Sequence, residues 1–263
     1  MEKTADYISE SERENMVYVF EELLSSVNRE GIDRLLDFIR KSDFYTAPAS
    51  TKYHDSCRGG LLRHSLQVYG CLDKKTSGSE HNIWREELDT DKVANESIII
   101  AGLLHDICKV YFYGSELKNQ KTYDPDKVAA ADRRQVKHDN NGDFIWETVP
   151  AYTVEDRVPY GHGEKSVMMI EEYIKLKPVE RYAIRWHIGF TEPRESWNTL
   201  KTAIEKYPLV LALVEADLEA VYIPKELPIL NMADGQKDQA DGGKQDFIPP
   251  VLEEGLPFTE AEE

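Results

Sequence analysis

The residues best suited to chemistry lie in an apolar stretch at residues 98–110, IIIAGLLHDICKV. Such a stretch indicates a segment inside the protein core, yet it contains His105, Asp106 and Lys109. A buried carboxylate is costly unless it is ion-paired or coordinates a metal ion. The sequence therefore predicts that other parts of the chain supply partners for Asp106.

Four further residues of metal-binding type each fall in a different predicted helix: His64, His162, His187 and Asp217. Each one alone is more typical of a buried histidine with a hydrogen-bond partner, or of a carboxylate capping a helix or paired with arginine. Together with the His-Asp pair they form one coherent ligand set. Imidazole and carboxylate ligands suit Mn²⁺, Fe²⁺, Co²⁺, Ni²⁺ or Zn²⁺, and Mg²⁺ is an alternative. We expect one or two divalent ions.

The spacing within the apolar stretch is suited to such a centre. On a helix His105 and Asp106 are about 100° apart, so both can reach one ion from adjacent sides. The two oxygens of Asp106 could also bridge two ions. Lys109 lies four residues after His105 and shares its helical face, so its ammonium can reach a substrate phosphate. An ion pair between Lys109 and a nearby acid is an equally good interpretation.

The hydrophobic pattern predicts an all-α protein with a small β-hairpin insertion. Apolar periodicity favours helices over residues 8–28, 31–41, 61–75, 91–110, 162–176, 178–189 and 205–222. Residues 114–160 read as the insertion, with a hairpin in KHDNNGDFIWETV at 137–149. We expect residues 1–44 to pack as N-terminal helices on a main domain at 45–223, followed by an acidic Pro/Gly-rich tail at 224–263.

Composition narrows the classes of function. The 263-residue chain has a net charge of −17, which disfavours nucleic acid as a partner. No stretch approaches the roughly 18 apolar residues of a membrane span, and the polar, acidic first residues do not read as a secretory signal. Cys57, Cys71 and Cys108 lack CxxC spacing and read as reduced thiols, so we expect a cytoplasmic protein.

Three segments resemble the signature of a known family. GGLLRHS, AGLLHDICK and LVEADLEA are similar to the signature segments of the HD-domain metal-dependent phosphohydrolase superfamily. The resemblance covers roughly residues 45–222 without the insertion, and GHGEKS and RWHIG supply the extra histidines of the binuclear members. The nearest types are HD hydrolases of bacterial and phage genomes, including the HD part of a 3′→5′ exoribonuclease group. An upstream OB-fold segment and the GYP motif of cyclic-di-GMP enzymes are missing.

The resemblance implies a helical HD bundle with two metal ions. The first would be held by His64, His105, Asp106 and Asp217, and the second by Asp106, His162 and His187. Asp106 and Lys109 would be the catalytic residues, with Lys109 beside the phosphate. Lys165, Arg185 and His54 are weaker candidates for substrate binding.

The expected function is hydrolysis of a small phosphate-containing substrate, a phosphodiester or a nucleotide, by metal-activated water. Two alternatives stay open at this stage. A di-iron oxygenase of the inositol-cleaving kind resembles this pattern and uses the same six ligands. A regulatory module that binds a metal or a nucleotide would need the ligands but no turnover.

Overall fold

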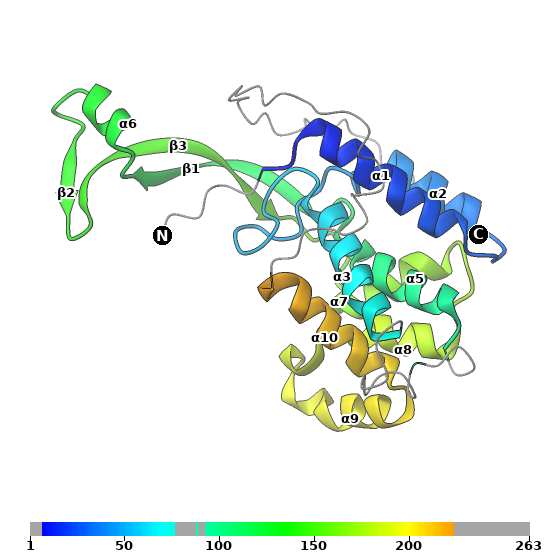
Figure 1. Cartoon of the computed structure of the whole chain (residues 1–263). Coiled ribbons are helices and arrows are strands. Elements are labelled where there is room, and N and C mark those ends of the chain that lie inside the picture. Colours follow the sequence, from blue (N-terminus) through cyan, green and yellow to red (C-terminus); the bar gives the residue numbers. More distant parts are fainter. Residues whose placement is uncertain (1–6, 77–87, 89–92, 224–263) are drawn as a thin grey trace, which may run out of the picture. The chain divides into compact units, whose positions relative to one another are not determined.

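The computed structural model describes residues 7–76, 88 and 93–223 and is mainly helical, with one three-stranded sheet (Figure 1). Its helices are α1 (Glu10–Ser25), α2 (Ile32–Lys41), α3 (Gly60–Thr76), α5 (Asn95–Leu104), α6 (Pro125–Ala130), α7 (His162–Glu171), α8 (Pro178–Trp186), α9 (Trp197–Lys206) and α10 (Leu209–Tyr222), with short 3-10 turns η1 (Ile107–Lys109), η2 (Gly189–Thr191) and η3 (Arg194–Ser196). Its strands are β1 (Tyr113–Thr122), β2 (Lys137–Asp139) and β3 (Gly142–Val154).

The described residues divide into two compact units. One comprises the helical residues up to 114 and from 152 onward, and the other comprises residues 115–151. The expected predominance of helix with one β insertion is confirmed at this level. The expected tail at 224–263 lies outside the described residues. Among the helices that are described, none combines the length and the apolar character needed to cross a membrane.

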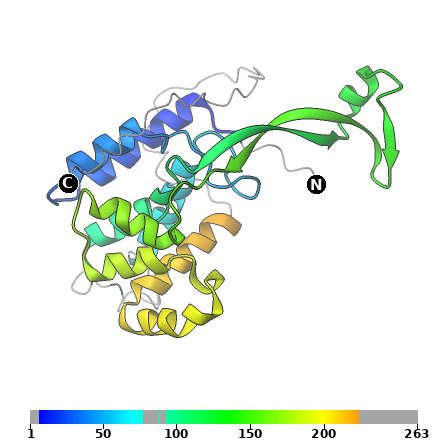
Figure 2. The ribbon, with the colours of Figure 1, turned by 180° about the vertical axis from the view of Figure 1, so that it is seen from behind.

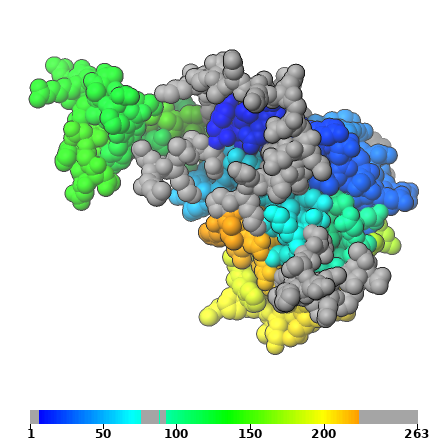
Figure 3. Space-filling view, in the orientation of Figure 1, coloured from blue at the N-terminus to red at the C-terminus, as the bar shows by residue number. Residues whose placement is uncertain are grey.

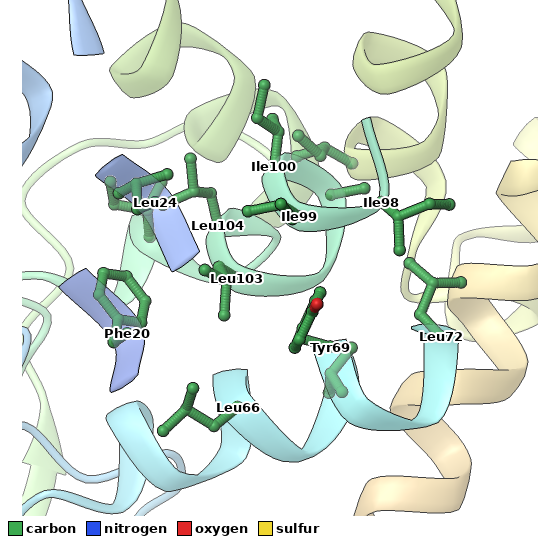
Figure 4. Packing of buried hydrophobic residues seen from close by; sticks show 14 of the residues in the cluster. Phe20, Leu24, Leu66, Tyr69, Leu72, Ile98, Ile99, Ile100, Leu103 and Leu104 are labelled. Atoms are coloured by element: carbon green, nitrogen blue, oxygen red, sulfur yellow. The ribbon is translucent and has the colours of Figure 1, made fainter. Parts of the chain in front are cut away.

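Helix α5 is the centre of the helical unit. Every residue from Ser97 to Leu104 is buried, as the all-round apolar sequence predicts. Phe20 and Leu24 of α1 approach it from one side, and Leu66 and Tyr69 of α3 from another (Figure 4). On the face seen in Figure 3, α10 lies between α3 and α9, and it packs on α3 and α8. The core therefore surrounds the helix that leads directly into the His-Asp pair.

Two glycines allow the helices beside this pair to cross closely. A Cβ on Gly102 of α5 would lie 2.7 Å from the Cα of Tyr69 in α3. A Cβ on Gly163 of α7 would lie 2.1 Å from the carbonyl oxygen of Arg185 in α8. Helices α7 and α8 lie side by side in the view from behind (Figure 2). Both crossings thus depend on the absence of a side chain.

The expected helices differ in extent from those observed, most clearly at 205–222 and at 91–110. The expected helix at 205–222 is two helices, because α9 ends at Lys206, Tyr207 is extended and α10 begins after Pro208. Proline disfavours helical backbone at the residue before it and lacks an N–H to continue the helix. The helix expected to reach residue 110 ends at Leu104, and Asp106 has non-helical φ and ψ of −108° and 18°.

The insertion contains the expected hairpin and more. Strands β2 and β3 pair antiparallel with Asp139 opposite Gly142, so Asn140 and Asn141 form a two-residue loop. Gly142 has φ of +118°, a conformation that glycine adopts without steric cost. The third strand, β1, and helix α6 were not predicted, and the strand order is β1-β3-β2.

Candidate metal centre

One buried carboxylate, that of Asp106, lies among four histidine rings. Its Oδ1 is 2.7 Å from Nε2 of His162 and 3.3 Å from Nε2 of His187. Its Oδ2 is 3.6 Å from Nε2 of both His64 and His105. Each oxygen therefore faces its own pair of imidazoles, and the four predicted histidines and Asp106 are brought together.

Each histidine comes from a different helix or helix end. His64 is in α3, His105 follows α5, His162 is the first residue of α7 and His187 follows α8. The centroids of the rings of His64 and His105 are 5.2 Å apart, those of His105 and His187 5.0 Å, and those of His162 and His187 5.5 Å. The four rings therefore form one continuous group, and imidazole binds metals in its neutral form.

Backbone carbonyls orient two of the rings. Nδ1 of His105 lies 2.9 Å from the carbonyl oxygen of Gly102, and Nδ1 of His187 lies 2.7 Å from that of Ile184. A neutral ring that donates its Nδ1–H to a carbonyl keeps the lone pair on Nε2. Both Nε2 atoms face Asp106. Such a carbonyl partner for the second nitrogen is typical of histidines that bind metals.

Asp217 of α10 joins the half of the site that contains His64. Its Oδ1 is 3.2 Å from Nε2 of His64, which in turn is 3.3 Å from Nε2 of His105. The side chain of Asp217 keeps 22% of its surface exposed, compared with 4% for Asp106. The predicted ligand Asp217 therefore lies at the solvent-facing edge of the group.

The charges of the site favour metal-binding protonation states. Burial alone would raise the pKa of Asp106, but the ammonium of Lys109 and the neighbouring rings more than offset this effect and hold that pKa well below its usual range. Burial lowers the pKa of His105 to about 3. Asp217 also has a lowered pKa, because the bond with His64 and the nearby imidazoles outweigh burial. The centre thus combines carboxylates with a neutral imidazole, the donor set of a divalent ion.

Lys109 adopts the ion-paired arrangement. Its Nζ is 2.6 Å from Oδ2 of Asp106, three residues earlier. The expectation that Lys109 shares the helical face of His105 is wrong, because the helix ends at Leu104 and residues 107–109 form a tighter 3-10 turn. The turn directs the ammonium to the carboxylate itself, which places it beside the site.

Cys108 belongs to the same group of side chains, although the sequence indicated only a reduced thiol. Its Sγ is 3.4 Å from both ring nitrogens of His162. Within the part of the chain that the structure describes, two sets of three residues could each hold a metal ion: His64 with His105 and Asp106, and Asp106 with Cys108 and His162. Burial raises the pKa of the Cys108 thiol to about 12. The one sequence signal was its place two residues after Asp106.

Of the three weaker candidates for substrate binding, His54 lies next to the ligand candidate His64. The ring of His54 is 5.0 Å from that of His64, and burial lowers the pKa of His54 to about 4. Among the described residues, neither Nε2 of His54 nor Nδ1 of His64 has a hydrogen-bond partner. These adjacent buried nitrogens leave unused hydrogen-bonding capacity beside the centre.

Lys165 and Arg185 are both paired with acids. Nζ of Lys165 is 2.7 Å from Oδ1 of Asp156 and 5.2 Å from the centroid of the Phe112 ring, which lies beside His162. The guanidinium of Arg185 binds Glu164 and Glu192, so it already has two anionic partners. Lys165 lies at the margin of the group, because its ammonium contacts Asp156 and the Phe112 ring that adjoins His162.

Comparison of the chain with protein-family models, with curated proteins and with solved structures found no match. The buried cluster of histidine, aspartate and cysteine side chains could hold a metal ion.

Proposed function

We propose that the protein is a metal-dependent phosphohydrolase with the binuclear ligand set of the HD superfamily. One observation carries this proposal: the two oxygens of Asp106 face separate pairs of histidines, at 2.7 and 3.3 Å on one side and 3.6 Å on the other. A carboxylate in this position is suited to bridge two ions. The order His, His-Asp, His, His, Asp along the chain and the mainly helical unit around it support the same assignment.

The chemistry follows from this ligand set. Divalent ions would supply hydroxide at neutral pH and neutralise charge on a phosphate oxygen. Asp106 would hold its position through the surrounding imidazoles, and the partly exposed Asp217 would orient the attacking water. The Lys109 ammonium, 2.6 Å from Asp106, is near enough to turn toward a phosphate that enters the site.

The proposed substrate is a small phosphodiester or a nucleotide. The net charge of −17 opposes binding along an extended nucleic-acid backbone. Two ions and one buried lysine concentrate positive charge at a single point, which suits one phosphate group. His54, whose ring adjoins that of His64, is proposed to contact this substrate, with Lys165 at the margin.

The test is release of nitrophenol from bis(p-nitrophenyl) phosphate by the full chain with Mn²⁺. We expect turnover by the wild-type protein and by Asp37→Asn, whose carboxylate is exposed on α2. Asp106→Asn should lose both turnover and bound metal. Turnover that persists in Asp106→Asn would contradict the proposal. Bound iron with oxygen uptake and no phosphate-ester hydrolysis would instead identify the oxygenase alternative.

A further inference from the structure

We propose that Cys108 binds metal as a thiolate, so that the two halves of the centre differ in chemistry. The inference rests on the proposed metal centre and specifies the ligands of one half. That half would comprise Cys108, Asp106 and His162, with His187 beside them. The other half, with His64, His105 and Asp217, offers only nitrogen and oxygen.

The distances within this half suit tetrahedral coordination. Sγ of Cys108 is 3.4 Å from both Nε2 and Nδ1 of His162, and that Nε2 is 2.7 Å from Oδ1 of Asp106. Sulfur and nitrogen ligands on a tetrahedral zinc ion, with bonds of about 2.3 and 2.0 Å, are about 3.5 Å apart. The Sγ–Nε2 distance is therefore close to ligand spacing. Because Sγ is equally far from Nδ1, the sulfur lies against the ring, and the imidazole must turn to direct its Nε2 lone pair at an ion shared with the sulfur. The carboxylate oxygen must also move outward by a few tenths of an ångström.

The surroundings of Cys108 set it apart from the other buried cysteine. Cys71 lies in the apolar cluster of the core, as a small hydrophobic residue commonly does. Cys108 is 1% exposed but is not part of either apolar cluster among the described residues. It lies against the ring of His162 and beside Asp106 instead. The neighbours of Cys108 thus include the candidate ligands His162 and Asp106.

A backbone hydrogen bond also ties Cys108 to the helix that carries His162. The N–H of Cys108 donates to Oγ of Ser166, 3.3 Å away in α7, one turn after His162. This bond ties the turn that carries Asp106 and Cys108 to the helix that carries His162. A ligand group held this way loses little conformational entropy when an ion binds.

Binding changes the bonds of the thiol in a simple way. The S–H bond breaks, its proton goes to solvent and a sulfur–metal bond forms. A thiolate with imidazole selects Zn²⁺, Fe²⁺ or Co²⁺ over Mg²⁺ and Mn²⁺. We therefore expect the half with Cys108 to retain a thiophilic ion while the other half exchanges its ion more freely.

Cobalt binding tests the inference without measuring activity. The chelator-treated full chain is titrated with Co²⁺, and two absorption signals are followed: the visible d–d bands, which report bound cobalt, and the near-ultraviolet sulfur-to-cobalt charge-transfer band, which requires a thiolate ligand. The variants are Cys108→Ala and Cys108→Ser, with Cys71→Ala as the matched control. Far-ultraviolet circular dichroism shows which variants are folded.

We expect both bands in the wild-type protein and in Cys71→Ala, and loss of the charge-transfer band in both Cys108 variants. Their affinity for one Co²⁺ should fall by at least the roughly 10-fold typical of losing a supporting residue. Visible d–d bands without charge transfer in the wild-type chain would overturn the thiolate but leave the metal centre intact. A charge-transfer band that persists in Cys108→Ser would also overturn the assignment of Cys108 as the thiolate ligand. Absence of any cobalt signal would overturn the metal centre itself.

Discussion

The ammonium of Lys109 lies 2.6 Å from Oδ2 of Asp106, the same oxygen that faces the rings of His64 and His105. Lysine and metal ion are thus alternative partners for one carboxylate oxygen. Both groups of the ion pair are buried, so the pair matters more than a surface ion pair would. In the proposed function, metal binding at Oδ2 would release the ammonium for a substrate phosphate.

Lys109→Met should lower kcat by about 100-fold, because removing one positive donor from a developing phosphate charge commonly costs that much. Bound metal, measured by elemental analysis, should be retained, since lysine is not among the ligands. Lys201→Met, at a side chain 72% exposed on α9, serves as the control with unchanged kcat. Loss of metal together with activity in Lys109→Met would show that Lys109 instead maintains the ligand geometry.

Substitution of glycine by alanine should have opposite effects at two positions. Gly163→Ala places a methyl group 2.1 Å from the carbonyl oxygen of Arg185, so α7 must move away from α8. We expect a loss of about 1–3 kcal/mol of unfolding free energy, as for other overpacked sites, and weaker metal binding by His162 and His187. Gly70→Ala meets no atom within 4 Å and should gain about 0.5–1 kcal/mol.

Urea denaturation of the two variants beside wild type measures both effects. Gly70→Ala is the control, because it removes the same backbone freedom from the unfolded chain as Gly163→Ala does. The difference between their changes in unfolding free energy therefore measures the effect of the methyl group at the crossing of α7 and α8. Equal stability changes in Gly163→Ala and Gly70→Ala would contradict the claim that the crossing depends on the missing Cβ.

Arg29 holds a fully buried carboxylate far from the centre. Its Nη1 and Nη2 donate to Glu180 at 2.6 and 3.0 Å, and Ser97 Oγ donates to the same carboxylate at 2.7 Å. Arg29→Met should lower the unfolding free energy by about 3–5 kcal/mol, because it leaves a buried charge without its counter-ion. The same change at Arg40, a side chain 47% exposed, should cost less than about 1 kcal/mol.

Thermal and urea unfolding give these values. Glu180→Gln in the Arg29→Met protein should restore part of the loss, since it removes the uncompensated charge. A double variant less stable than Arg29→Met would count against the charge explanation and favour lost hydrogen bonds.

The chelator-treated protein should lose stability as the pH falls below about 6.5. His105 has its ordinary pKa of 6.5 in the unfolded chain but a pKa of about 3 when folded, because burial disfavours its charged form. Above pH 6.5 the ring is neutral in both states and contributes no pH dependence. Between the folded pKa of about 3 and the unfolded pKa of 6.5, only the unfolded chain binds this proton. The unfolding free energy therefore decreases by up to about 1.4 kcal/mol for each pH unit by which the pH falls.

Urea midpoints at about pH 7.5 and about pH 5 measure this slope. His105→Gln should reduce the difference between the two, and His138→Gln, exposed on β2, should not. Asp106 and Asp217 have lowered pKa values, so their contribution is present above their ordinary pKa of 3.8 and is lost only below it. If the unfolding free energy of His105→Gln depends on pH as that of the wild type does, burial does not lower the pKa of His105 as described.

The tertiary structure alone placed Cys108 in the site. Its type and position were evident, but a lone cysteine without CxxC spacing gives no metal signal, and only the approach of α7 brings His162 to its sulfur. The weaker candidate Arg185 shows the reverse case. Its basic side chain made it a weaker candidate for substrate binding, whereas the fold gives it Glu164 and Glu192 as partners.

The sequence by itself determined the residue types of the candidate ligands, the helices that contain or adjoin them and the burial of the His-Asp pair, because helical periodicity and apolar composition are local properties. It did not determine where the central helix ends, and so it wrongly placed His105 and Lys109 on one face of a continuous helix. The division of the Asp106 oxygens between two pairs of histidines was decided by the tertiary structure. That division depends on helix crossings at Gly102 and Gly163, where distant segments approach to within backbone contact, and no local pattern encodes such distances.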